Sequence, residues 1–216
     1  METAPIATPP RRAGFLGVYD AACLLTLAGA LAAFAGLALA SRGRVELALV
    51  ALMLAGLADL FDGVLARRLR RDAFARAYGT QLDTVVDVVA FVAAPAAIAL
   101  HAGVWSWPGL AGMGLFVLAG ITRLAHFNTL AVMGVDQSTH HRGLPVTYTA
   151  LLFPLLFLAR DFAPSAFPFL LAGAFPLLAL LFVIDVPVRK PRGAFYLLLP
   201  ALAAGLIVYW TWRQWP

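Results

Sequence analysis

Residues 59–87 read DLFDGVLARRLRRDAFARAYGTQLDTVVD, and both ends of this stretch continue into apolar runs, at 47–58 and 88–100. An unpaired carboxylate at membrane depth is costly and is kept mainly where it has a function. Four of the 11 acidic residues of the chain nevertheless stand in two pairs at the ends of the stretch: Asp59 with Asp62, and Asp83 with Asp87. We therefore expect a functional site with a cation among these carboxylates.

The composition is that of an integral membrane protein. Of the 216 residues, 62% are hydrophobic and 12% are charged, whereas soluble domains carry about a quarter charged residues. The net charge of +5 comes from arginines gathered in short loops between apolar segments, which favours a membrane protein with one basic side over a nucleic-acid binder. Cys23 is the one cysteine, so neither a disulfide framework nor a cysteine metal site is expected.

We expect an all-α fold: one polytopic membrane bundle over residues 14–216 with six to seven transmembrane helices. A membrane-spanning helix needs about 20 apolar residues. Seven segments approach this length: 21–40, 47–67, 79–100, 108–127, 143–159, 167–184 and 194–211. The fifth is short and Pro154 interrupts it, so the count stays between six and seven. Residues 1–13 are predicted to form a disordered cytoplasmic N-terminus.

The loops determine the predicted orientation. If the helices alternate in direction, the basic segments 11–12, 67–76, 129–142 and 188–192 share one side of the membrane. Loops rich in arginine stay on the cytoplasmic side. We therefore expect a protein of the cell (inner) membrane whose acidic residues face the cytoplasm, with a 67–76 loop joining the second and third helices.

The spacing of the acids brings them together. Asp59 and Asp62 are three residues apart, and Asp83 and Asp87 are four apart, so each pair shares one face of a helix. Two adjacent antiparallel helices can then direct all four carboxylates to one point. Such a set supplies oxygen ligands for one or two Mg²⁺ or Mn²⁺ ions, with a substrate phosphate completing the coordination. The structural alternative is a set of buried ion pairs with neighbouring arginines.

Small and basic residues accompany the acids. Gly63 and Gly79 remove side chains at positions where a nucleotide or phosphate can approach the backbone. Ala66 keeps the same face shallow, and Arg67 can bind a phosphate through two nitrogen atoms. These four residues are the predicted phosphate-binding residues.

This pattern is similar to the signature of the CDP-alcohol phosphotransferase family, DxxDGxxARx(8)GxxxDxxxD. In this chain 11 residues, rather than eight, separate DLFDGVLAR from GTQLDTVVD, and the extra three fall in the predicted loop. The resemblance implies a membrane enzyme that transfers a phosphatidyl-type group from a CDP-linked donor to a hydroxyl and releases CMP. It also implies that all four aspartates bind Mg²⁺ or Mn²⁺, as two ions, that Asp87 is in addition the general base, and that the phosphate-binding residues contact CDP.

Three further stretches resemble the phosphatidylserine synthases of this family. They are VVAFVAAPAAIAL at 88–100, RLAHFN at 123–128 and RGLP at 142–145. The resemblance implies transfer from CDP-diacylglycerol to L-serine, giving phosphatidylserine and CMP. Arg123 or Arg142 could hold the serine carboxylate in a bidentate contact, or equally the phosphate of another acceptor.

Several alternatives stay open. Residues 90–93 and 146–149 depart from the usual sequence of the phosphatidylserine synthases, so inositol phosphate and glycerol phosphate remain candidate acceptors. A divalent-cation transporter is the alternative from a different class, although it would not need Gly63 and Arg67 and would usually show repeated halves, which this chain lacks. The expected partners are the CDP-lipid, the small alcohol and membrane lipid, without nucleic acid, and a homodimer is an open alternative.

Overall fold

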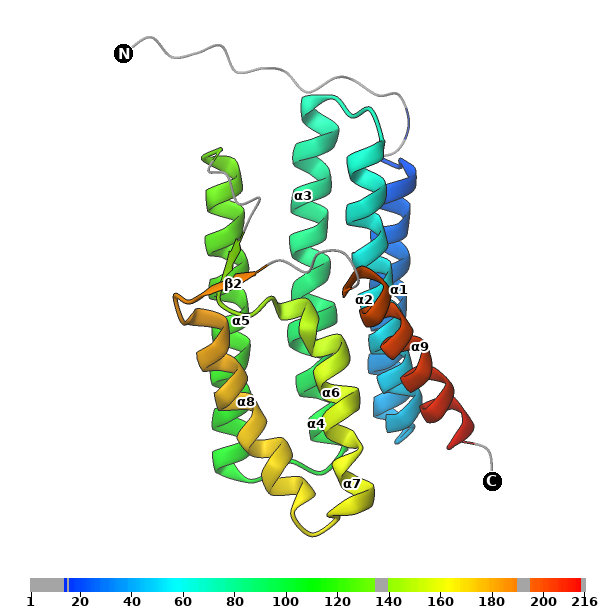
Figure 1. Cartoon of the computed structure of the whole chain (residues 1–216), viewed down its shortest axis with the longest axis vertical. Coiled ribbons are helices and arrows are strands. Elements are labelled where there is room, and N and C mark those ends of the chain that lie inside the picture. Colours follow the sequence, from blue (N-terminus) through cyan, green and yellow to red (C-terminus); the bar gives the residue numbers. More distant parts are fainter. Residues whose placement is uncertain (1–13, 15, 135–139, 190–194, 215–216) are drawn as a thin grey trace.

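The computed structural model describes residues 14, 16–134, 140–189 and 195–214. Within these residues the chain forms a bundle of helices running roughly along one axis (Figure 1). The α-helices are α1 Ala21–Ser41, α2 Val45–Arg68, α3 Ala73–Asp87, α4 Ala94–His101, α5 Trp107–Val132, α6 Thr149–Phe157, α7 Ala159–Phe162, α8 Phe167–Val183 and α9 Phe195–Trp212. A π-helical turn, Val88–Ala93, joins α3 to α4 without a break, and a 3₁₀ turn, Val146–Tyr148, precedes α6. Residues 1–13, predicted to be disordered, lie outside the described residues.

The predicted all-α membrane bundle is confirmed. Four helices are long and apolar enough to cross a membrane: α1, α2, the continuous α3–α4 helix (Ala73–His101) and α5. Phe167–Val183 and Leu197–Trp212 form shorter apolar helices. The fifth predicted segment, 143–159, is divided into the 3₁₀ turn, α6 and the start of α7. These elements together account for the six to seven segments expected.

A short β ribbon was not expected in an all-α fold. Strands β1 (His140–Arg142) and β2 (Pro187–Arg189) pair in antiparallel register, with His140 opposite Arg189. The ribbon ties the α5–α6 connection to the α8–α9 connection (Figure 1). Both connections were assigned to the same side of the membrane from the sequence, and their pairing agrees with that assignment.

The predicted 67–76 loop is wrong. The link between α2 and α3 comprises only Leu69–Asp72, and α3 begins at Ala73 rather than at Gly79. The reason is a helix cap: the Asp72 side chain accepts a hydrogen bond from the backbone amide of Ala75, at 2.7 Å. Most of the long interval before Gly79 therefore lengthens α3 by nearly two turns instead of forming a loop.

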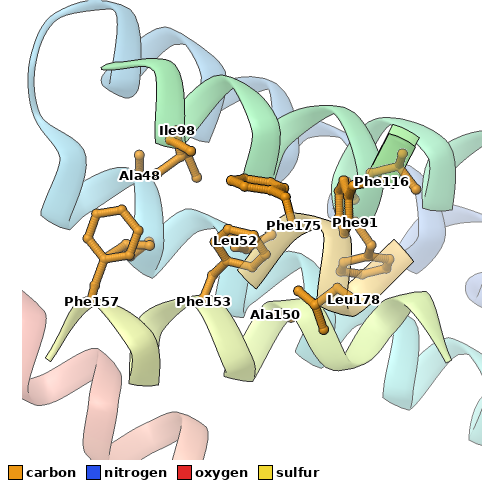
Figure 2. Close-up of a cluster of buried hydrophobic side chains, with 14 of the residues drawn as sticks. Ala48, Leu52, Phe91, Ile98, Phe116, Ala150, Phe153, Phe157, Phe175 and Leu178 are labelled. Atoms are coloured by element: carbon orange, nitrogen blue, oxygen red, sulfur yellow. The ribbon is translucent and has the colours of Figure 1, made fainter. Parts of the chain in front are cut away.

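The apolar core lies in the half of the bundle away from the α2–α3 link. There α4, α6 and α8 pack beside α2 and α5, and aromatic rings interlock between them (Figures 1 and 2). The ring of Phe116 lies 5.2 Å from that of Phe175, 5.3 Å from Phe182 and 6.2 Å from Phe153, centroid to centroid. In the other half, α1, α2, α3 and α5 are the described helices that extend toward the end of the bundle (Figure 1).

We predict that Phe116→Ala lowers the free energy of unfolding by about 3 kcal/mol, because it removes a fully buried ring and leaves a cavity among three others. Leu118→Ala is the matched control on the same helix. Leu118 is 65% exposed on the outer surface, so its truncation should change the free energy by less than about 0.5 kcal/mol. Denaturant titration in mixed micelles measures both, and equal losses would contradict the assignment of the core.

Candidate functional site

Three of the four aspartates meet at one point. Carboxylate oxygens of Asp59 on α2 and of Asp83 and Asp87 on α3 all lie within 4.8 Å of one another. Asp87 is buried, and the other two side chains are half-buried. Among the described residues, no arginine or lysine forms an ion pair with these three carboxylates, and Arg123 acts on Asp87 only as a nearby charge. The alternative of structural ion pairs therefore finds no support, and the donor set fits a divalent cation.

Asp62 is held differently from the other three. Its Oδ2 accepts a hydrogen bond of 2.5 Å from the hydroxyl of Thr26 on α1, and both side chains are buried. The two residues line a small cavity with the other three aspartates, but Asp62 is not part of the group within 4.8 Å. The four predicted carboxylates thus form a close group of three, Asp59, Asp83 and Asp87. The fourth, Asp62, lies beside this group and is held by Thr26 of α1.

Thr26 was missed by sequence reasoning. It lies on a face of α1 made almost entirely of small residues, which packs against α2. The buried residues of this face are Ala22, Cys23, Thr26, Gly29, Ala33, Gly36 and Ala40. A single hydroxyl in such a stripe needs a polar partner inside the bundle, and this was the signal that could have identified it.

A cavity of about 500 Å³ opens beside the three carboxylates. Its walls come from α2, α3, α5, α6, α9 and residues 145–148. The polar and charged residues of its lining are Asp59, Arg67, Thr80, Asp83, Thr84, Asp87, Arg123, Asn128, Thr147 and Tyr148. The apolar lining includes Met53, Leu57 and Leu60 of α2 and Leu199, Pro200 and Ala203 of α9. The volume suits a small-molecule site with a polar end and an apolar wall.

The four predicted phosphate-binding residues divide into two pairs. Gly63 and Arg67 line the cavity, one helical turn apart on α2. Ala66 and Gly79 are not among its lining residues. A Cβ atom added at Gly79 would lie 2.9 Å from Nη1 of Arg71, so the glycine makes room for this arginine.

Arg71 joins the α2–α3 link to the start of α1. Its Nε and Nη2 donate to the two carboxylate oxygens of Asp20, at 2.8 and 2.6 Å. Asp20 also caps α1 by accepting from the amides of Ala22 and Cys23. The hydrogen bond from Arg71 is the main reason that the pKa of Asp20 is lowered to about 2. This ion pair fixes the helix that carries Thr26 relative to the helix that carries Asp83.

Of the two predicted acceptor-binding arginines, Arg123 lies in the cavity wall. Its side chain is buried, and its guanidinium carbon lies 4.4 Å from the ring centroid of Phe127. The Nε atom of Arg123 has no hydrogen-bond partner among the described residues, and the guanidinium interacts electrostatically with Asp87. The side chain of Arg142 lies outside the described residues, so its role stays a prediction.

Three curated proteins are similar to the chain. The CDP-diacylglycerol–serine O-phosphatidyltransferase of Saccharomyces cerevisiae is 38% identical over 99 residues, which are 44% of this chain and 35% of the yeast protein. The archaetidylserine synthase of Methanothermobacter thermautotrophicus is 28% identical over 78% of this chain and 68% of its own length. The phosphatidylcholine synthase of Rhizobium johnstonii is 25% identical over 89% and 80%. The chain thus spans about a third of the yeast relative and about two thirds of the archaeal one.

The sequence model of one family covers most of the chain. The CDP-alcohol phosphatidyltransferase model matches residues 19–185, which include α1 to α8 and all four aspartates. The resemblance found in the signature is therefore confirmed, and the chain is that of a membrane transferase rather than of a cation transporter. It belongs to the CDP-alcohol phosphatidyltransferase family.

Proposed function

We propose that this enzyme transfers the phosphatidyl group of CDP-diacylglycerol to the hydroxyl of L-serine, giving phosphatidylserine and CMP. The observation that carries the proposal is the pairing, in one cavity, of the three-carboxylate group with the buried Arg123. A guanidinium with an unpartnered Nε suits the carboxylate of an amino-acid acceptor. The yeast and archaeal relatives, which are named for serine transfer, support the same acceptor.

The residues proposed to hold metal are Asp59, Asp83 and Asp87, with Asp62 available for a second ion. Mg²⁺ or Mn²⁺ bound there would neutralise the pyrophosphate of the donor and stabilise the charge that develops on phosphorus. Arg67 and Gly63, on the cavity wall next to Asp59, are proposed to contact the donor phosphates. Ala66 and Gly79, which lie outside the lining, would shape the two helices rather than touch CDP.

Asp87 is proposed as the general base. It lies at the innermost, buried end of the group, in the same cavity as Arg123. A serine held by Arg123 would direct its hydroxyl toward Asp87, which takes the proton as the oxygen attacks the lipid-bearing β-phosphorus. The new bond joins the serine oxygen to this phosphorus, and the bond from the phosphorus to the oxygen of CMP breaks. The apolar wall formed by α2 and α9 would accommodate the acyl chains and limit the access of water.

The positive charge of Arg123 also argues against other acceptors. Choline, the alcohol named for the Rhizobium relative, carries a cation and no carboxylate, so a buried guanidinium would oppose it. Inositol phosphate and glycerol phosphate would be attracted, and they are the competing acceptors. The proposed location is the inner membrane, with the cavity at the cytoplasmic end, because the four arginines of 67–71 lie at this end of the bundle.

The direct test supplies the purified protein with CDP-diacylglycerol, Mn²⁺ and each of four alcohols, and identifies the lipid product by mass. We expect phosphatidylserine from L-serine at a rate at least about tenfold above the products from choline, inositol phosphate or glycerol phosphate. EDTA should stop the reaction and Mg²⁺ or Mn²⁺ should restore it. A product from another alcohol alone would overturn the acceptor, and full activity in EDTA would overturn the metal site.

Asp87→Asn should lower kcat by about 10²–10⁴-fold, because the amide cannot accept the proton of the acceptor hydroxyl. Binding of CDP-diacylglycerol, measured by equilibrium binding in nanodiscs, should persist. Glu46→Gln is the control: Glu46 lies at the opposite end of the bundle, where Arg160 and Gln214 hydrogen-bond to its carboxylate, so kcat should be unchanged. Retention of full activity by Asp87→Asn would exclude the general-base role.

Arg123→Lys should raise the KM for L-serine by about tenfold while the KM for CDP-diacylglycerol changes less than about twofold, since lysine keeps the charge but loses the planar fork. L-serinamide, which lacks the carboxylate, provides a matched substrate. The wild type should prefer serine over serinamide strongly, and the variant should lose most of this preference. An equal preference in both proteins would show that Arg123 does not recognise the carboxylate.

A further inference from the structure

The helix that carries Asp83 and Asp87 changes its winding directly after Asp87. Residues Val88–Ala93 form the π-helical turn, in which the amide of Ala94 donates to the carbonyl of Val89, five residues back. Such a turn takes up one residue more than an α-helical turn and is common at functional sites. The side chains before and after it are therefore offset by about 100° from their directions in an uninterrupted α-helix.

This offset separates the site from the core. Asp87 and Ile98 are 11 residues apart, and in an uninterrupted α-helix they would project within about 20° of each other. Ile98 is fully buried in the apolar core, where Figure 2 shows it on the helix that follows the turn. Asp87 lines the cavity with the other acids. The π turn thus lets one continuous helix direct an apolar side chain to the core and a carboxylate to the site.

Pro95, just after the turn, removes a backbone donor from it. In α-helical geometry the carbonyl of Phe91 would accept from the amide of residue 95, but proline has no N–H. Inside a membrane bundle no bulk water replaces the lost bond. The hydroxyl of Thr149, at the start of α6, lies 3.0 Å from the Phe91 carbonyl oxygen, and this side chain is fully buried.

The Thr149 hydroxyl has a second carbonyl within hydrogen-bonding distance. The hydroxyl lies 2.8 Å from the carbonyl oxygen of Val146, which also accepts from the backbone amide of Thr149. On the other side of the turn, a Cβ atom added at Gly120 of α5 would lie 2.7 Å from a methyl group of Val92. The π turn is therefore packed between α5 and α6, and the Thr149 hydroxyl can donate to its Phe91 carbonyl as well as to Val146.

We propose that Thr149 is a positioning residue of the transferase site: its hydroxyl completes the hydrogen bonding of the π turn and so fixes the direction of Asp87. The inference rests on the proposed role of Asp87 as the base. Thr149 itself touches no reacting atom in this scheme. It acts through the backbone of Phe91, four residues after Asp87.

A double-mutant cycle tests the proposal. Thr149→Val keeps the shape and removes the hydroxyl, and it should lower kcat at least about tenfold with less than about a threefold change in the KM for CDP-diacylglycerol. Thr149→Ser should restore kcat to within about threefold of the wild type. Pro95→Ala supplies a backbone N–H near Phe91, so in this background Thr149→Val should cost less than about threefold. Deuterium exchange of the amides in 89–96 should rise in Thr149→Val alone and return toward the wild-type rate in the double variant.

Thr129→Val is the matched control, because its hydroxyl bonds the Ala125 carbonyl on the exposed surface of α5, and kcat should be unchanged. Three results would each overturn the proposal. They are equal losses of kcat from Thr149→Val in both backgrounds, a kcat of Thr149→Val within twofold of the wild type, and failure of Thr149→Ser to restore kcat. The assay uses whichever alcohol the wild type accepts in the acceptor panel. If L-serine fails as the acceptor, the double-mutant cycle can therefore still be measured with another alcohol. If the cycle contradicts the role of Thr149, the assignment of the acceptor is unaffected.

Discussion

The mutual repulsion of three carboxylates inside an apolar bundle is the constraint on which the site depends. Asp59, Asp83 and Asp87 bring oxygens within 4.8 Å of one another, yet no described arginine or lysine forms an ion pair with them, and Arg123 alone acts on Asp87 as a nearby charge. Like charges at this separation in a low-dielectric surrounding are strongly unfavourable without a counter-charge. A fold that keeps them together must gain from a ligand that binds there, and a divalent ion with the pyrophosphate of a CDP-lipid is the ligand expected in this family.

The remaining architecture can be understood as support for that arrangement. Interlocked phenylalanine rings stabilise the half of the bundle away from the α2–α3 link (Figure 2), so the other half can remain open beside the acids. Three polar contacts from outside α2 and α3 then fix the open half. Thr26 holds Asp62, the Asp20–Arg71 pair joins α1 to the α2–α3 link, and Thr149 bonds the turn that follows Asp87.

Most of the fold and the centre of the site could be predicted from the sequence because both follow from short-range periodicity. The intervals between the acids place two carboxylates on one face of each helix, and apolar length marks the helices. What could not be predicted depends on partners distant in the chain. Thr26 and Asp62 are 36 residues apart and Thr149 and Phe91 are 58 apart, so no local pattern connects them. The start of α3 was misplaced because the arginines before it favoured a loop, whereas the Asp72 cap decides the boundary.

The long interval before Gly79 illustrates how a departure from a family signature can be accommodated. Residues 73–78 of this interval form the start of α3, and Arg71 lies in the short link, where it reaches Asp20 at the start of α1. Its guanidinium then lies against the backbone of Gly79, where a Cβ atom would be only 2.9 Å away. In this chain the signature glycine therefore leaves room for an arginine of the link, and the proposed donor contacts fall to Gly63 and Arg67 on α2. Because the longer interval lies before Gly79 and not between Gly79 and Asp87, the spacing that sets the α3 carboxylates is preserved.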